Sequence, residues 1–285
     1  MTSIILLNYN NHNDTIECLE SLNNVEGIFN VVLVDNKSKD DDVLSIEEYL
    51  RGNKLQYHID FIKADTNGGF AYGNNIGIKY AIDHYDSESF LLLNNDTVVE
   101  SNLLSSLTKL LENEVVIATP RVVFFDKPEI IWGEGGYFNE KLATGVNGNM
   151  LKHIEKANKI NDCSFASFCC VLLSRKAIDE VGLLSEDYFM YFEDADYCKR
   201  VQIKGYKIAI TTETVVYHKV SAASGGLRSP FYLEWCTRSN RIFIKKLYKS
   251  KKVYFRFRFK VLLKKIYFIL HFDFVKYKAL CRGLK

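Results

Sequence analysis

Short apolar runs alternate with helical patterns through residues 4–93, and this alternation constrains the fold more than any other feature of the chain. The runs that predict strands lie at 4–7, 31–34, 57–63 and 90–93. The helical patterns between them lie near 14–23, 43–51 and 71–85. Alternation at this spacing predicts an α/β fold with a mostly parallel central sheet and helices on both faces. In such a sheet, ligands bind beyond the carboxyl ends of the strands.

The composition is that of a globular chain. The 285 residues suffice for one large or two small domains, and 47% hydrophobic residues can fill a sizeable core. The seven cysteines are odd in number and lack C-x-x-C spacing, so we expect reduced core residues and neither a disulfide framework nor a zinc site. Residues 1–7 carry no basic region and no small-residue cleavage site, which predicts a cytoplasmic protein.

Polar, turn-prone loops follow the first three predicted strands. Their candidate ligand-binding residues are Asn8, Tyr9 and Asn10, then Asp35, then Asn67, Gly68 and Gly69 with Asn74 and Asn75 shortly after. A carboxylate such as Asp35 can accept hydrogen bonds from a ribose or a base, and paired glycines let a backbone approach a ligand. Gly-Gly by itself is also an ordinary turn, and the segment matches neither a Walker loop nor a G-x-G-x-x-G fingerprint.

The fourth predicted strand ends in Asn94-Asn95-Asp96, a lone carboxylate at the mouth of a buried strand. Such a carboxylate suits a metal ion, whereas an Asx-rich turn is the structural alternative. The other motifs of the chain favour the metal-site interpretation over the turn.

Five short motifs, in this order, resemble the family 2 glycosyltransferases, especially their rhamnosyltransferase-like branch. They are Asn8-Tyr9-Asn10, Val34-Asp35-Asn36, Asn67-Gly68-Gly69-Phe70-Ala71-x-Gly73-Asn74-Asn75, Leu93-Asn94-Asn95-Asp96 and Phe192-Glu193-Asp194-x-Asp196-x-x-x-Arg200. The resemblance covers roughly residues 3–240. It implies a GT-A fold, in which a nucleotide-sugar-binding α/β domain is completed by an acceptor-binding C-terminal half. The strand-end residues above, together with Asn94 and Asn95, would then bind the nucleotide sugar.

On this resemblance, Asp96 stands where the family carries the last carboxylate of its D-x-D metal motif, with Asn94 replacing the first one. Asp96 would hold Mg²⁺ or Mn²⁺ bridged to the donor diphosphate. One carboxylate suffices in principle, because these ions also bind substrate phosphates. His218, at the end of a predicted strand over 211–217, is expected to complete the site. The glycine-containing segment 221–226 would order when the donor binds.

Asp194 is the expected catalytic base, with Glu193 beside it, because inverting sugar transfer needs a carboxylate that takes the proton of the acceptor hydroxyl. The same acidic cluster starts a predicted helix and would stabilise its dipole, and the two roles are compatible. Trp132 and Asp196 are expected on the acceptor side, near segments 132–137 and 165–173. Leu184-Ser185-Glu186 replaces the Phe-Asp-Glu often found before the acidic motif.

The tail is strongly basic. Residues 245–285 hold fourteen Lys or Arg and one Asp, a charge of +13 beside −11 for the rest of the chain. Written as one helix, the tail has a broad apolar face made of Phe259, Leu262, Leu263, Ile266, Ile269, Leu270, Tyr277 and Leu280. Cations on another face predict peripheral contact with an anionic membrane, on its cytoplasmic side; packing on the body is the alternative. No uncharged run approaches the roughly 20 residues of a spanning helix.

We therefore predict an inverting, metal-dependent glycosyltransferase that moves a sugar from a nucleoside diphosphate, with dTDP-rhamnose as the expected donor, to a hydroxyl of a lipid-linked or surface polysaccharide. Residues 1–240 would form the transferase domain, with 1–100 as the nucleotide half and 101–240 as the acceptor half, and 241–285 the tail. Transfer from a UDP-hexose and a non-catalytic nucleotide-sugar-binding protein stay open. The acidic body disfavours a nucleic-acid-binding module, and the missing Lys-bearing phosphate loop disfavours a nucleotidyltransferase.

Overall fold

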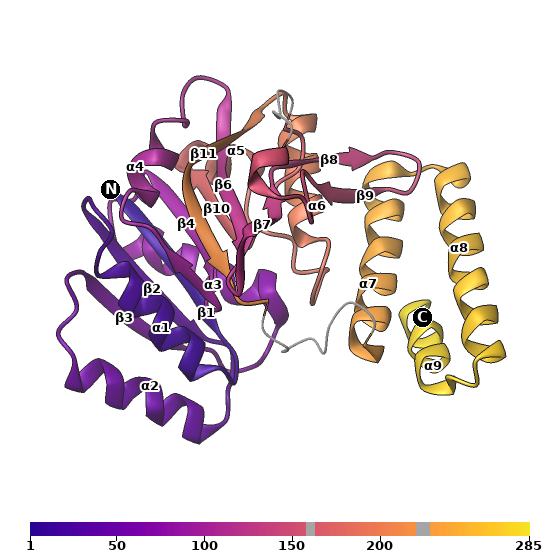
Figure 1. The fold of residues 1–285 in the computed structure, drawn as a ribbon, viewed down its shortest axis with the longest axis horizontal. Coiled ribbons are helices and arrows are strands. Elements are labelled where there is room, and N and C mark those ends of the chain that lie inside the picture. The colour runs from indigo at the N-terminus through magenta and orange to yellow at the C-terminus, as the bar shows by residue number, and fades with distance from the viewer. Residues whose placement is uncertain (158–162, 221–228) are drawn as a thin grey trace.

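The computed structural model describes residues 1–157, 163–220 and 229–285. In these residues the central sheet has nine strands in the order β3-β2-β1-β4-β10-β6-β11-β5, with β7 added to β6 (Figure 1). Its strands are β1 (Thr2–Asn8), β2 (Phe29–Asp35), β3 (His58–Lys63), β4 (Ser89–Asn94), β5 (Thr97–Val99), β6 (Val115–Phe124), β7 (Lys127–Glu134), β10 (Cys170–Ser174) and β11 (Lys207–His218). A separate two-stranded ribbon joins β8 (Gly136–Asn139) and β9 (Thr144–Asn147).

The predicted α/β fold with a mostly parallel sheet is confirmed. Strands β3, β2, β1 and β4 are parallel neighbours, as are β6 and β11. Strand β10 is antiparallel to both of its neighbours, and β5 and β7 are antiparallel to β11 and β6. The four strands predicted in the N-terminal part all form, each with ends shifted by two residues at most.

Helices cover both faces of the sheet because apolar side chains alternate along its strands. In β1, Ile4 and Leu6 pack with side chains of α1, α2 and α4, whereas Ile5 packs on the other face with α3. The helices are α1 (His12–Leu22), α2 (Asp40–Gly52), α3 (Gly69–His84), α4 (Leu103–Thr108), α5 (Arg175–Val181), α6 (Glu193–Ile203), α7 (Pro230–Phe243), α8 (Lys251–Leu270) and α9 (Phe274–Gly283), with a short 3-10 turn at Ile154–Lys156 and a π-helical turn at Ile244–Tyr248. The central strands are thereby buried on both sides.

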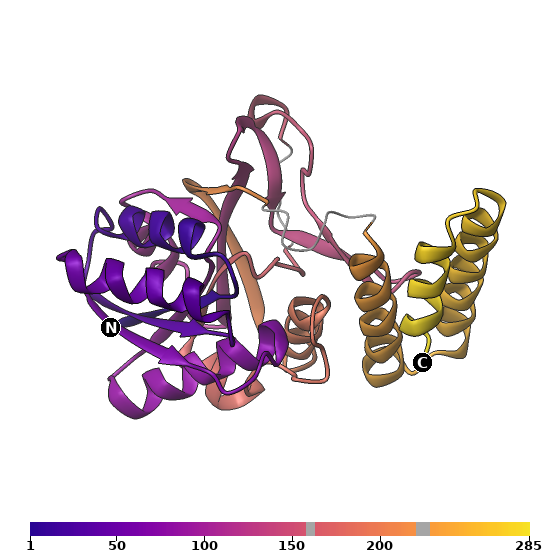
Figure 2. The same ribbon diagram turned by 90° about the horizontal axis from the view of Figure 1, so that it is seen from below.

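Helices α7, α8 and α9 form a group at one end of the molecule, beyond the sheet (Figures 1 and 2). The C-terminal region is helical, as expected, but it is not one helix: α8 ends at Leu270 and α9 starts at Phe274, where Asp273 accepts a hydrogen bond from the Lys276 N–H at 3.1 Å. Leu280 is buried, so it does not share an exposed face with Phe259. The predicted boundary between residues 240 and 241 falls inside α7.

No helix in the described parts of the chain is long and apolar enough to cross a membrane.

Candidate active site

The carboxyl ends of β1, β2 and β4 lie side by side and bring polar side chains to one edge of the sheet. Asn8 is in register with Asp35, and Leu7 is in register with Asn94. The Asn8 amide donates to Asp35 Oδ1 at 2.8 Å, and the Ser38 N–H donates to Asp35 Oδ2 at 2.9 Å. Asn8 and Asp35 are both buried. These contacts hold the Asp35 carboxylate in one orientation at the predicted ligand edge.

Asp42, at the start of α2, belongs to the same network and was missed from the sequence. The Asn8 amide donates to Asp42 Oδ2 at 2.7 Å, and the His12 N–H donates to Asp42 Oδ1 at 2.9 Å. Burial raises the pKa of Asp42, but the hydrogen bonds from Asn8 and His12 outweigh burial and lower it. The sequence signal was three consecutive Asp residues, which on their own indicate only a helix start.

Tyr9 and Asn10 follow β1 with different surroundings. Asn10 has a left-handed φ of 51°, donates its N–H to Ser38 Oγ at 2.8 Å and accepts from the Lys39 N–H at 2.9 Å. It thereby ties the loop after β1 to the loop after β2. The Tyr9 ring is exposed and available to stack on a ligand.

The loop Asn67-Gly68-Gly69 lies beside the end of β2 and leads into α3. Asn67 Oδ1 accepts from the Gly69 N–H and from the Asn36 amide, both at 3.0 Å. Gly69 has a φ of +87°, and a Cβ at this position would come closer than 3.0 Å to the carbonyl of Phe189. In this structure the close backbone approach at Gly69 is made by the protein itself. Contact of this loop with a donor stays a prediction.

Asn74 and Asn75 are buried within α3 and are engaged by the protein. The Asn74 amide donates to the Phe70 carbonyl at 2.9 Å. The Asn75 amide donates to the Leu184 carbonyl at 3.0 Å and to Glu186 Oε1 at 2.8 Å, while its own oxygen accepts from the Leu184 N–H at 3.1 Å. Asn75 thus fixes the segment before the acidic motif, and its predicted contact with the donor would require it to leave these partners.

Asp96 and His218 meet at the edge of the sheet although they lie far apart in the sequence. Strand β5 begins immediately after Asp96 and pairs antiparallel with β11, so that Thr97 faces His218. His218 Nε2 lies 3.2 Å from Asp96 Oδ1, and both side chains are largely buried. His218 Nδ1 is buried without a hydrogen-bond partner in the described residues. A carboxylate beside an imidazole with an unsatisfied nitrogen is a donor set that suits a divalent cation.

Asn94 and Asn95 connect this point to β10 and α1. The Asn94 N–H donates to the Cys169 carbonyl at 2.8 Å, and the Asn95 amide donates to Thr15 Oγ1 at 2.8 Å. Asn95 is therefore turned towards α1, and its predicted contact with the donor stays untested.

Lys219 is a second residue that the sequence reasoning missed. Its N–H donates to the Asp96 carbonyl at 2.9 Å, and its ammonium group lies between Asp14 and Glu17 of α1, 2.7 Å from Asp14 Oδ1. The ammonium neutralises part of the negative charge of Asp14 and Glu17, and the backbone contact ties the chain after His218 to Asp96. The only signal in the sequence was its position directly after His218.

Glu193 and Asp194 occupy the first turn of α6, as predicted. Burial raises the pKa of Asp194 to about 6, although a hydrogen bond from the Ala195 N–H at 2.7 Å opposes the shift. Burial, together with the charge of Asp194, raises the pKa of Glu193 well above its ordinary value. Asp194 is half-buried and can reach a ligand, whereas Glu193 is buried. A carboxyl with a pKa near neutrality is suited to general-base chemistry.

Asp196 has a different role from the expected one. Its side chain is 0% exposed, forms an ion pair with Arg200 at 2.6 Å and accepts from the Tyr188 hydroxyl at 3.1 Å. Arg200 in turn donates to the carbonyls of Val181 and Leu183 at 2.8 and 2.9 Å. Asp196 therefore fixes the chain that leads into α6, and its burial is inconsistent with direct contact with an acceptor.

Trp132 lies beside the metal candidate residues. Its ring is perpendicular to the His218 imidazole, with 4.6 Å between the ring centroids. The same strand carries Glu134, which is buried and paired with Arg121 at 2.7 Å. A role of Trp132 in acceptor binding stays a prediction. The predicted donor-ordering segment 221–226 lies outside the described residues.

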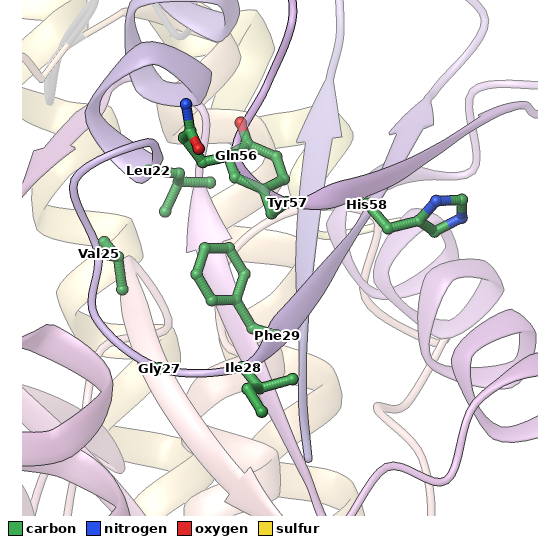
Figure 3. A pocket seen from close by; sticks show the side chains of 8 residues that line it. All are labelled: Leu22, Val25, Gly27, Ile28, Phe29, Gln56, Tyr57 and His58. Carbon is green, nitrogen blue, oxygen red and sulfur yellow. The ribbon is translucent and has the colours of Figure 1, made fainter.

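A pocket of about 250 Å³ opens between the amino ends of β2 and β3, at the edge of the sheet opposite to the candidate site (Figure 3). Its lining is Leu22, Val25, Gly27, Ile28, Phe29, Gln56, Tyr57 and His58. Because it lies at the wrong edge of the sheet for the strand-end residues, it takes no part in the site described above.

A mostly parallel sheet with helices on both faces and polar side chains at the carboxyl ends of its strands is the architecture of the GT-A type of glycosyltransferase. The chain belongs to glycosyl transferase family 2, whose family model matches residues 3–182. The resemblance inferred from the five motifs is therefore confirmed.

Curated relatives carry names of sugar transferases. The chain is 26% identical to the low-salt glycan biosynthesis hexosyltransferase Agl10 of Haloferax volcanii, over 86% of this chain and 77% of the relative. It is 24% identical to the rhamnosyltransferase WbbL of Escherichia coli, over 73% of this chain and 79% of the relative.

Solved structures share the fold. The mannosyltransferase PcManGT from Pyrobaculum calidifontis, solved in complex with GDP-Man and Mn²⁺, aligns with a TM-score of 0.61 at 12% identity, over 99% of this chain and 73% of that one. TarS 1–349 of S. aureus aligns with a TM-score of 0.54 at 15% identity, over 86% of this chain and 66% of that one.

Proposed function

We propose that this glycosyltransferase is an inverting, metal-dependent enzyme that moves rhamnose from dTDP-rhamnose to a hydroxyl of a lipid-linked or surface polysaccharide. The observation that carries the proposal is the meeting of Asp96 and His218 at the strand-end edge, 3.2 Å apart. Residues 1–100 supply the nucleotide half, residues 101–240 the acceptor half and residues 241–285 the tail. Strands β1, β2 and β4, whose ends form the donor edge, all lie in the first of these ranges.

The residues at the edge fit Mg²⁺ or Mn²⁺. Asp96 offers carboxylate oxygens and His218 offers a ring nitrogen, and no cluster of three or more His, Cys, Asp or Glu ligands occurs in residues 1–157, 163–220 and 229–285. A cation with two protein ligands takes its other ligands from water and the donor diphosphate, which is usual for Mg²⁺ in nucleotide sites. When bound, the cation would neutralise charge on the departing diphosphate. Mn²⁺ in the PcManGT complex supports this choice.

Asp194 acts as the base in this proposal. Its carboxylate takes the proton of the acceptor hydroxyl while that oxygen forms a bond to the anomeric carbon. The bond from this carbon to the diphosphate oxygen breaks on the opposite face, and the nucleoside diphosphate leaves with the bonding electron pair. The partial exposure of Asp194 and its pKa of about 6 support this role.

The donor is proposed from relatives and not from a sugar-reading side chain. WbbL is named a rhamnosyltransferase, and a Shigella flexneri relative, 23% identical over 68% of this chain, is named dTDP-rhamnosyl transferase RfbF. Agl10 is named a hexosyltransferase, which keeps transfer from a UDP-hexose as the alternative. A protein that binds a nucleotide sugar without catalysis is the remaining alternative, and the transferase names of the relatives argue against it.

The tail supplies a proposed contact with the cytoplasmic face of an anionic membrane. Helix α8 buries Val253, Phe257 and Val261 where it packs against α7, α9 and the turn at Ile244–Tyr248. Its opposite face exposes apolar side chains at spacings of three and four residues: Phe255, Phe259, Leu262, Leu263, Ile266, Ile269 and Leu270. Cations flank this face, among them Arg256, Arg258, Lys260 and Lys265. An exposed apolar stripe between rows of cations matches the boundary between acidic headgroups and acyl chains.

Nucleotide binding tests the proposal. The melting temperature of the protein would be measured with dTDP-rhamnose, UDP-galactose, UDP-glucose and GDP-mannose, each with and without Mn²⁺. We expect a Mn²⁺-dependent rise of several degrees with dTDP-rhamnose alone, together with slow hydrolysis of that donor. A rise in melting temperature with a UDP-sugar would identify that UDP-sugar, and not dTDP-rhamnose, as the donor. The lack of any metal-dependent response would refute the proposed function.

A further inference from the structure

The segment of residues 189–192 connects the glycine loop before α3 to the carboxylate at the start of α6. The Phe70 N–H donates to the Phe189 carbonyl at 3.1 Å, and Gly69 lies against the same carbonyl so closely that a Cβ has no room. The Gly69 carbonyl accepts from the Asn36 amide at 3.2 Å. Asn36 in turn donates its N–H to the Asn8 carbonyl at 2.8 Å. A chain of direct contacts therefore runs from the ends of β1 and β2 to Phe189.

Helix α7 holds the segment from the other side. The Ser239 hydroxyl donates to the Met190 carbonyl at 2.8 Å. The rings of Trp235 and Phe189 lie 4.5 Å apart between centroids, and those of Tyr232 and Tyr191 lie 5.1 Å apart. The segment is thus clamped between the glycine loop and α7.

The last two residues of the segment have strained backbone conformations. Tyr191 and Phe192 have φ values of 67° and 71°, in a region that non-glycine residues rarely adopt. The Phe192 carbonyl then accepts from the Asp196 N–H at 2.8 Å and begins α6. Such conformations persist only where surrounding contacts maintain them, and they cluster at functional sites. The direction of the Asp194 carboxylate therefore depends on contacts that reach from the glycine loop and from α7.

We propose that residues 189–192 are a positioning element that couples the donor-binding loop to Asp194, and that Gly69 is the positioning residue that permits this contact. The proposal rests on the proposed function in taking Asp194 as the base and residues 67–69 as part of the donor site. Its physical basis is that Phe189 contacts the glycine loop directly and that only three residues, two of them with left-handed φ, separate it from the first turn of α6. Donor binding at the glycine loop would thereby set the position of the base.

The first test compares two glycine-to-alanine variants by amide hydrogen exchange without any nucleotide. Gly69→Ala introduces both an unfavourable φ and the collision with Phe189. The matched control is Gly27→Ala, because Gly27 also has a positive φ, +111°, but no atom lies within 4 Å of its Cβ position. We expect exchange in residues 189–193 to rise about tenfold or more in Gly69→Ala and to stay at the wild-type rate in Gly27→Ala. Equal rates in the two variants, both folded, would overturn the proposal.

The second test uses a variant that leaves the glycine loop intact. Ser239→Ala removes only the hydrogen bond to Met190, and we expect faster exchange in residues 189–193, a lower kcat and an unchanged donor KM. The acid limb of the pH–rate profile should also move below its wild-type position, because a less confined Asp194 has a lower pKa. If the donor KM changes without a change in kcat, or if the pH–rate profile does not shift, the hydrogen bond between Ser239 and Met190 is only structural and the proposal fails.

Nucleotide binding then separates this inference from the proposed function. With dTDP and Mn²⁺, and in parallel with UDP and Mn²⁺, wild-type protein should show slower exchange in residues 189–193, and Gly69→Ala should not. A melting-temperature rise without slower exchange refutes the coupling and leaves the proposed function standing. If neither nucleotide raises the melting temperature, the proposed function fails, and the nucleotide-free comparison still decides whether Gly69 holds the segment.

Discussion

His218 Nε2 lies 3.2 Å from Asp96 Oδ1 because strand β5 returns directly from Asp96 to pair with β11. The pairing of Thr97 with His218 leaves little freedom in where the imidazole lies relative to the carboxylate. Two groups from different parts of the sequence are therefore preorganised at the edge where β1, β2 and β4 end. The predictions below start from this pair.

Asp96→Asn and His218→Ala should each weaken Mn²⁺-dependent binding of dTDP by about tenfold to a hundredfold, because each removes a ligand or the group that orients it. Isothermal titration with and without Mn²⁺ measures the effect. Asp126→Asn is the matched control, since Asp126 is an exposed carboxylate in the turn between β6 and β7. Unchanged metal dependence in both site variants would remove the pair from the metal site.

Asp194→Asn should lower kcat by about 10²–10⁴-fold while leaving donor affinity near its wild-type value, because it removes proton transfer and keeps the side-chain shape. Single-turnover transfer and nucleotide titration measure the two quantities. Glu193→Gln is the comparison: burial and Asp194 raise the pKa of Glu193, so glutamine resembles the form that the fold favours. If kcat falls more in Glu193→Gln than in Asp194→Asn, then Glu193 and not Asp194 is the catalytic base.

Activity should fall on the acid side with a midpoint near pH 6, because the base must be deprotonated and burial raises the pKa of Asp194 to about 6. The free energy of unfolding depends on pH in the opposite direction from activity. The unfolded chain releases this proton at lower pH than the folded chain, so the contribution of Asp194 to stability is full below its unfolded pKa and is lost as pH rises through its folded pKa. Urea denaturation at pH 8 should therefore show Asp194→Asn to be more stable than wild type by about 1–2 kcal/mol, with a smaller difference at pH 5.

Asp196→Ala should lower the free energy of unfolding by about 3–5 kcal/mol, because it leaves Arg200 without its buried partner. Its control is Asp179→Ala, which removes an exposed ion pair with Arg175 that also joins residues four apart on one helix. Exposed pairs contribute about 0–1 kcal/mol. Urea denaturation of the two variants measures the difference, and similar losses would contradict the structural role assigned to Asp196.

Phe259→Glu and Leu263→Glu, on the exposed face of α8, should each weaken binding to vesicles rich in anionic lipid by about tenfold, because each removes an apolar side chain that would insert into the lipid and adds a charge that the anionic lipid repels. Ile28→Glu is the control, since Ile28 is 83% exposed and lies by the pocket at the other edge of the sheet. Vesicle co-sedimentation measures the effect. Deleting residues 250–285 is a poorer test, because the buried Leu280 of α9 packs in the same cluster as Leu233 of α7. Unchanged vesicle binding in both α8 variants would show that this face does not contact the membrane.

The N-terminal half could be predicted because its information is local. Each strand of the parallel part is a short apolar run, and each loop after it carries its polar residues directly at the strand end, so Asn8, Asp35 and Asp96 could be placed at one edge from the sequence. The tail could not be predicted in the same way. Helix α8 is apolar on two opposite faces, and only the packing of Val253 and Phe257 shows which face is buried.

The roles of buried polar side chains also depended on tertiary structure. Asp196 belongs to an acidic motif that suggests a ligand, yet in the fold it is enclosed with Arg200 and Tyr188. Gly69 suggests room for a ligand, yet its missing side chain makes room for Phe189. The sequence by itself determined the strands, their polar ends and the family, because these follow from residue patterns within a few positions. Only the tertiary structure decided which polar groups meet each other and which stay accessible, because those contacts join segments that the order of residues does not relate.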